Sequence, residues 1–143
     1  MLISNTKGLT IQVVKRLKLA VFTWSGFTPS EVYKEGTIQS LETLRNNPTI
    51  NRIILNTKDH SVVMHEDIEA SVRATVNYLG IAKGSYKMAV VLPTDLLAKS
   101  SVSFYVDLMN KTLKKRFVVR QHENMKKAFS WLTQSSHTRF FAN

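Results

Sequence analysis

Residues 24–33, Trp-Ser-Gly-Phe-Thr-Pro-Ser-Glu-Val-Tyr, constrain the fold of this chain more than any other stretch. They join an apolar run at residues 19–24 to a well-marked helix start. Thr28 and Glu31 have the Thr-x-x-Glu spacing of a capping box, and Pro29 suits the first helical position because its missing N–H costs nothing there. A strand, a glycine turn and a capped helix in this order indicate the opening of an α/β domain, with Thr28 as the predicted N-cap.

The rest of the chain repeats this alternation of apolar runs and helical periodicity. Strands are expected at residues 9–14 and 19–24, which form an N-terminal hairpin, and at 50–56, 87–92 and 117–119, with 2–4 as a possible extra pairing segment. Helices are expected at 29–45, 68–79 and 95–113, the last with Leu97, Phe104, Leu108 and Met109 facing inward, and in a closing helix with a stripe of Met125, Ala128, Phe129 and Leu132.

These elements predict one α/β domain over residues 1–143, with a core at about 9–133 and a frayed tail at 134–143. Strands that alternate with helices favour a mixed, mostly parallel central sheet of four to five strands with about four helices and an N-terminal β-hairpin. A chain of 143 residues is long enough to bury its own core.

The net charge of +10 is unevenly distributed along the chain, since residues 83–143 hold eleven Lys and Arg against three Asp and Glu. A patch of Lys114, Lys115, Arg116 and Lys127 could attract an anion or nucleic acid. A solvated helix end and strand edge is the preferred interpretation of these charges. Nucleic acid is the less favoured partner, because aromatic side chains that would stack on bases are nearly absent from this region.

Sequence motifs for catalysis are missing. The chain has no cysteine, no glycine-rich phosphate loop and no Gly-x-Ser-x-Gly turn, and the spacing of His60 and His65 is not one that metal sites favour. We therefore expect no enzyme activity, no cofactor and no metal. The lack of a signal-peptide pattern, of a long apolar segment and of cysteine predicts a protein of the cytoplasm without a transmembrane segment.

Aromatic residues gather at the junction of the first expected helix. Trp24, Phe27 and Tyr33, together with Phe104 of the third helix, could line an apolar pocket between sheet and helices. Packing in the core is the commoner role of such residues and is the preferred interpretation. A pocket of this kind would accept a small apolar ligand.

Several segments carry a resemblance to a known family. They are the Trp24-Ser25-Gly26 turn with Thr28 and Tyr33, the strand at 52–56 followed by Thr57-Lys58-Asp59, residues 63–67, Met88-Ala89-Val90-Val91, and the ending Phe117…Met125…Ala128-Phe129-Ser130-Trp131-Leu132. In order and spacing the chain resembles the SpoIIAA-like family of STAS and SEC14-like small domains. The resemblance implies a sheet of four or five strands covered by helices, and a regulatory role that is usually not enzymatic.

The resemblance also implies where a partner would bind. Anti-sigma-factor antagonists of this family carry a phosphorylatable serine at the start of the second helix, where this chain has Glu66 and Asp67. Our leading hypothesis is a non-catalytic regulatory domain that binds another protein through Asp59, Ser61, Glu66 and Asp67, with a fixed charge in place of the phosphate. The alternative is a SEC14-like carrier of a small lipid-like ligand. An exposed hairpin edge would also allow a homodimer.

Overall fold

The computed structural model describes residues 2–79, 84–113 and 115–141. Its strands are β1 (Leu2–Thr6), β2 (Leu9–Val14), β3 (Leu19–Gly26), β4 (Arg52–His60), β5 (Tyr86–Val91) and β6 (Phe117–His122). Its helices are α1 (Ser30–Asn46), α2 (His65–Leu79), α3 (Leu96–Thr112) and α4 (Met125–Phe141), with a short 3-10 turn, Lys15–Leu17, between β2 and β3.

The strands form one sheet in the order β1-β2-β3-β4-β5-β6. The pairs β1–β2 and β2–β3 are antiparallel, whereas β3, β4, β5 and β6 run parallel because a helix separates each from the next. The predicted α/β class, the mixed sheet, the N-terminal hairpin and the four helices are confirmed. The sheet has six strands rather than four to five because the short β1 pairs with β2.

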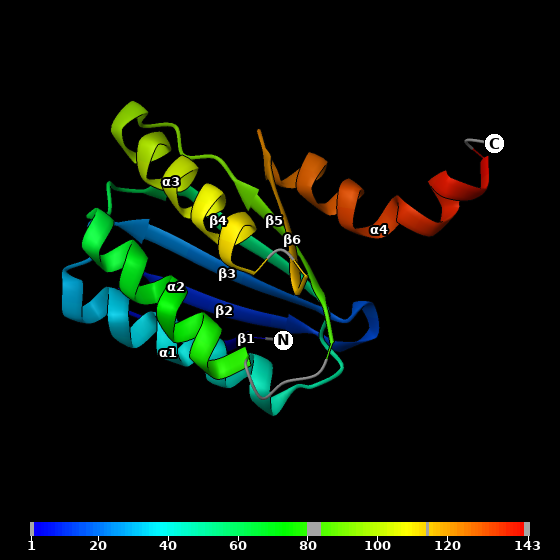
Figure 1. Cartoon of the computed structure of the whole chain (residues 1–143), viewed down its shortest axis with the longest axis horizontal. Helices are drawn as coiled ribbons and strands as arrows, with labels where there is room; N and C mark the ends of the chain where they lie inside the picture. The colour runs from blue at the N-terminus through cyan, green and yellow to red at the C-terminus, as the bar shows by residue number, and fades with distance from the viewer. Residues whose placement is uncertain (1, 80–83, 114, 142–143) are drawn as a thin grey trace.

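The helices lie on both faces of this sheet (Figure 1). Successive right-handed crossovers that step in one direction along a sheet place their helices on one face, so α1, α2 and α3 share a face. Their core includes Leu44 of α1, Val72 of α2 and Val102 of α3. The chain leaves β6 toward the other face, where α4 buries Ala128 and Leu132 in a separate core.

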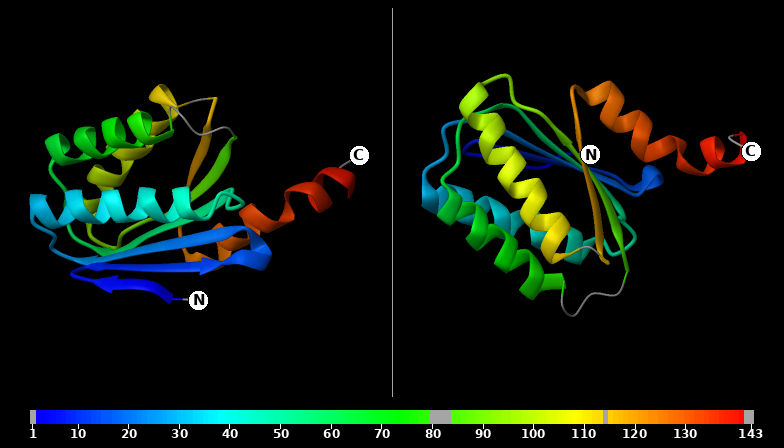
Figure 2. Two further views of the ribbon diagram at one scale, coloured as in Figure 1. Left: turned by 90° about the horizontal axis from the view of Figure 1, so that it is seen from below. Right: turned by 45° about the horizontal axis from the view of Figure 1, so that its top comes forward.

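Helix α2 packs against α1 and α3 and lies farther from the sheet than α1 (Figure 2, left). The helices therefore do not form one flat layer: α2 bridges the other two over the middle strands. This arrangement places the inward side chains of all three helices around a common space above β3, β4 and β5.

Some local expectations are wrong. Thr28 does not cap α1: Pro29 is the N-cap residue without a side-chain bond, and the Thr28 side chain is buried instead. Leu97 is 68% exposed rather than inward, because Ala98 and Val102 occupy the buried side of α3. Of the four residues predicted as the stripe of the closing helix, Ala128 and Leu132 are buried, whereas Met125 and Phe129 are exposed. The structure describes that helix as far as Phe141.

Candidate functional site

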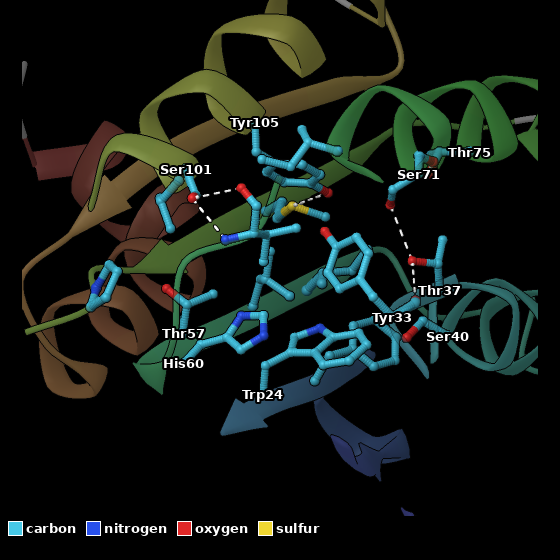
Figure 3. Close-up of a pocket in the computed structure, with 18 of the residues that line it drawn as sticks. Trp24, Tyr33, Thr37, Ser40, Thr57, His60, Ser71, Thr75, Ser101 and Tyr105 are labelled. Carbon is cyan, nitrogen blue, oxygen red and sulfur yellow. Dashed lines mark hydrogen bonds between the residues drawn. The ribbon is translucent and has the colours of Figure 1, made fainter. Parts of the chain in front are cut away.

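The space beneath α2 is a partly open cavity of about 80 Å³, measured as the room for the centre of a water-sized sphere. Its floor is formed by the sheet, including Trp24, Ile53 and Met88, and its walls are formed by α1, α2 and α3. Figure 3 shows Tyr33 and Tyr105 entering it from two different helices. Since one enclosed water needs roughly 10–15 Å³ on this measure, the cavity holds a molecule of roughly five to eight non-hydrogen atoms.

Small hydroxyl side chains leave this cavity unfilled. The inward positions of the three helices include Thr37, Ser40, Ser71, Thr75 and Ser101, which are all shorter than the leucines that usually fill a core. Three of the hydroxyl groups donate to a carbonyl one turn earlier in their own helix, as Thr75 does to Ser71 at 2.9 Å. Thr37 Oγ1 also lies 3.2 Å from Ser71 Oγ, in a hydrogen bond that joins α1 to α2, so these polar atoms are satisfied within the protein.

Three aromatic rings form the wall of the cavity toward the start of α1. Trp24 stacks on His60 with ring centroids 5.3 Å apart, and Tyr33 lies 5.0 Å from Trp24 and 6.2 Å from His60. Helix α1 can approach Trp24 because residue 36 is glycine: a Cβ there would collide with the far edge of the indole ring. This wall offers flat apolar surface for a ligand to stack on.

A β-bulge in β4 directs His60 into the cavity. Thr23 pairs with Asn56 and Ser25 with Asp59, so β4 has one residue more than β3 in this interval. The extra residue reverses the alternation of faces, because side chains point to opposite faces at each successive position of a regular strand. Asp59 is exposed as a result, and His60 is buried at 6% exposure.

The polar groups of this wall are uncharged near neutral pH. His60 Nε2 lies 3.0 Å from Thr28 Oγ1 in a buried hydrogen bond, and burial lowers the pKa of His60 to about 4. Burial likewise raises the pKa of Tyr33 to about 12 and moves the pKa of Tyr105 upward. No Lys, Arg, Asp or Glu is among the described lining residues. A charged ligand would lose its hydration here without a counter-ion, so the cavity suits an uncharged one.

The structure brings together two of the four residues predicted for a pocket. Trp24 and Tyr33 line the cavity, whereas Phe27 and Phe104 do not. Phe27 follows Gly26, whose left-handed backbone (φ 69°) turns the chain away, and its side chain is 73% exposed. Phe104 stacks on His65 with ring centroids 4.0 Å apart, on the side of α3 that faces the start of α2.

The residues predicted as a partner surface lie near the carboxyl ends of the parallel strands. Asp59 and Glu66 are exposed there, and Asp67 is half-buried and accepts a 2.8 Å hydrogen bond from Ser30 of α1. Ser61 is half-buried and lines the cavity. The four residues share one edge of the sheet, but only Asp59 and Glu66 are fully available to a partner.

The predicted basic patch is divided by the fold. Lys115 and Arg116 precede β6 and Lys127 follows it, so they lie at opposite ends of a six-residue strand, about 20 Å apart. The Arg116 guanidinium donates to the carbonyl of Leu79 at 3.0 Å, and Lys127 forms an ion pair with Glu123 at 3.1 Å. Lys114 lies outside the described residues.

The residues that make the cavity polar were not predicted to line it. His60 lies beyond the strand expected at 50–56, and the bulge that buries it depends on pairing with β3, which the sequence of β4 does not reveal. The inward serines and threonines left a weak signal: Ser71 and Thr75 are four residues apart beside the apolar stripe of α2.

In the described part of the chain, no group of three or more His, Cys, Asp and Glu side chains is placed to hold a metal ion. No helix in the same residues is long and apolar enough to cross a membrane.

Comparison with protein-family models, with curated protein sequences and with solved structures finds no match for this chain.

Proposed function

We propose that this protein is a non-catalytic domain that binds a small, uncharged and largely apolar molecule in the cavity beneath α2. The observation that carries the proposal is a cavity of about 80 Å³ walled by Trp24, Tyr33 and His60. This is the SEC14-like alternative of the sequence analysis in a narrower form. A long acyl chain exceeds the space available, whereas a single ring with one hydroxyl group fits it.

Trp24 provides the readout for a test of binding. The chain has two tryptophans, so Trp131→Phe leaves Trp24 as the only indole. Titration with benzyl alcohol should change the Trp24 fluorescence saturably. Thr75→Leu places a larger apolar side chain in the cavity and should weaken binding by about tenfold or more. Native mass spectrometry of the purified protein tests for a resident ligand, as an extra mass that is lost on denaturation.

A matched control is available on α4. Thr133 also donates its hydroxyl to a carbonyl one turn earlier, but it is exposed and remote from the cavity. Thr133→Leu should leave the affinity for benzyl alcohol unchanged, and thermal unfolding would verify that both variants are folded. Equal affinity in the Thr75→Leu and Thr133→Leu proteins would contradict the proposal.

A second proposed function is the regulatory protein contact implied by the SpoIIAA-like resemblance. It is supported by exposed apolar side chains in the loops and at the start of α3, at the carboxyl ends of the strands, namely Phe27, Val62, Met64, Leu96 and Leu97. Such residues at one end of a domain are typical of interaction surfaces. The double variant Glu66→Ala/Asp67→Ala should abolish capture of the partner from a native extract while the fold stays intact. Unchanged capture would contradict this role.

A further inference from the structure

The adjacent parallel strands β5 and β6 are followed by helices on opposite faces of the sheet. After β5 the chain enters α3 on one face of the sheet, and after β6 it enters α4 on the other. The two connections diverge at the carboxyl ends of adjacent parallel strands, and an open hollow of about 570 Å³ lies between them. In open α/β sheets, ligands bind in crevices outside the carboxyl ends of the strands. Pro93 separates the hollow from the cavity beneath α2, since it lines both.

The hollow is strongly cationic. Lys58 of β4, Lys99 of α3 and Lys126 of α4 line it from three elements. None of their ammonium groups has an ion-pair partner among the described residues. The acidic residue of the lining, Glu123, is already paired with Lys127 at 3.1 Å.

This charge arrangement favours an anion. Three like charges around one concavity repel one another and raise the local potential, and a bound anion relieves that repulsion. The amino end of α4 borders the same hollow at Met125 and Lys126 and adds the positive end of the helix dipole. The lysines surround a hollow instead of forming a track along the surface, so the geometry suits a compact anion better than a polymer.

We propose that this hollow binds a small molecule carrying one or two phosphate groups, held by Lys58, Lys99 and Lys126. The site is separate from the uncharged cavity, and it does not depend on the basic patch predicted from the sequence. Phosphate oxygens can accept hydrogen bonds from all three ammonium groups, which a single carboxylate cannot do as completely. If the cavity beneath α2 binds no uncharged ligand, the proposal of an anion site in the hollow is unaffected.

Calorimetric titration with pyrophosphate tests the site. The wild-type protein should bind pyrophosphate, and its affinity should fall as NaCl rises from about 50 mM to about 200 mM. The triple variant Lys58→Gln/Lys99→Gln/Lys126→Gln should lose about tenfold or more in affinity. Amide chemical shifts in labelled wild-type protein should change mainly at residues 92–95 and 123–126 when pyrophosphate is added.

The control is a triple variant with the same loss of charge elsewhere. Lys15, Lys34 and Lys111 are exposed and lie outside the hollow, so Lys15→Gln/Lys34→Gln/Lys111→Gln should keep the wild-type affinity. Thermal unfolding verifies that both triple variants are folded. No binding by the wild type, or an equal loss in the two variants, would overturn the proposal. Retention on vesicles of phosphatidic acid without binding of pyrophosphate would assign the site to a lipid headgroup and overturn the small-molecule ligand.

Discussion

Acidification should destabilise this protein through His60 in particular. Its imidazole is buried against Trp24 and Tyr33 and shares a hydrogen bond with Thr28, and burial lowers its pKa from 6.5 to about 4. In the unfolded chain the same imidazole is hydrated and binds a proton near its ordinary pKa of 6.5. Between these two values the unfolded state holds a proton that the folded state does not, so stability falls as the pH falls.

The size of the effect follows from the two pKa values. Between pH 7.5 and pH 5 the proton taken up by the unfolded state favours unfolding by about 2 kcal/mol, and the full loss below pH 4 is about 3 kcal/mol. The half-buried His122, whose pKa is lowered by burial and by the neighbouring Arg120, adds a contribution of the same sign. A comparison with a His60 variant therefore isolates the contribution of His60 to the pH dependence of the free energy of unfolding.

Urea unfolding at a series of pH values and constant ionic strength measures this loss. His60→Gln keeps an amide that can bond to Thr28 but cannot titrate. At pH 7.5 the variant should be less stable than the wild type by about 1–2 kcal/mol, because it loses the ring contacts with Trp24 and Tyr33. Only the wild type has a residue 60 that takes up a proton on unfolding, so only its free energy of unfolding falls through this residue as the pH falls. The free energies of unfolding of wild type and variant should therefore converge toward pH 5. A difference that stays constant between pH 7.5 and pH 5 would refute the assignment of a neutral, buried His60.

Other substitutions test contacts made by residues of α1, by the cap of α3 and by α3 itself. Gly36→Ala should cost about 1–3 kcal/mol in thermal or urea unfolding, because the new methyl group collides with Trp24, and an unchanged stability would show that the ring moves freely. Asp95→Ala removes the carboxylate that accepts from the first turn of α3 at 2.9 Å and should cost about 1 kcal/mol of unfolding free energy, measured with Asp95→Asn as the retaining control. Ser101→Ala removes the hydroxyl that bonds both the N–H and the carbonyl of buried Val63 and should cost about 1–3 kcal/mol; a cost below 0.5 kcal/mol would mean that water replaces it.

The sequence predicted the order of elements because each one carries a local signal. The apolar run of β5 and the spacing of Ile68, Val72 and Leu79 in α2 depend only on neighbouring residues. The alternation of strands and helices then restricts the topology to a mostly parallel sheet. The cap of α1 was predicted wrongly for the opposite reason: the sequence matches a capping box locally, but Thr28 is bonded to His60, which lies 32 residues away.

The site was predicted in part because only some of its residues carry such a signal. Trp24 and Tyr33 were selected as aromatic residues near a strand-to-helix turn, and both line the cavity. The cavity itself depends on which helix faces meet beneath α2 and on the absence of bulky side chains at those positions. An unfilled space in the core corresponds to no particular residue type in the sequence. Ser71 and Thr75 resemble ordinary surface residues of a helix as long as the positions of the neighbouring helices are unknown.

The division of charge between the two proposed sites follows from solvent access. Burial lowers the pKa of His60 in the wall of the cavity beneath α2, and an ammonium group buried there would lose its hydration at a cost of several kcal/mol. The lysines instead surround the open hollow on the far side of Pro93, where their side chains are exposed to water. The two sites meet at Pro93, which lines both, yet their linings select opposite chemistries. An uncharged ring in the hollow would merely make few contacts, whereas a phosphate in the cavity would lose its hydration without a counter-ion. The free-energy cost of binding at the wrong site is therefore larger for the anion than for the uncharged ring.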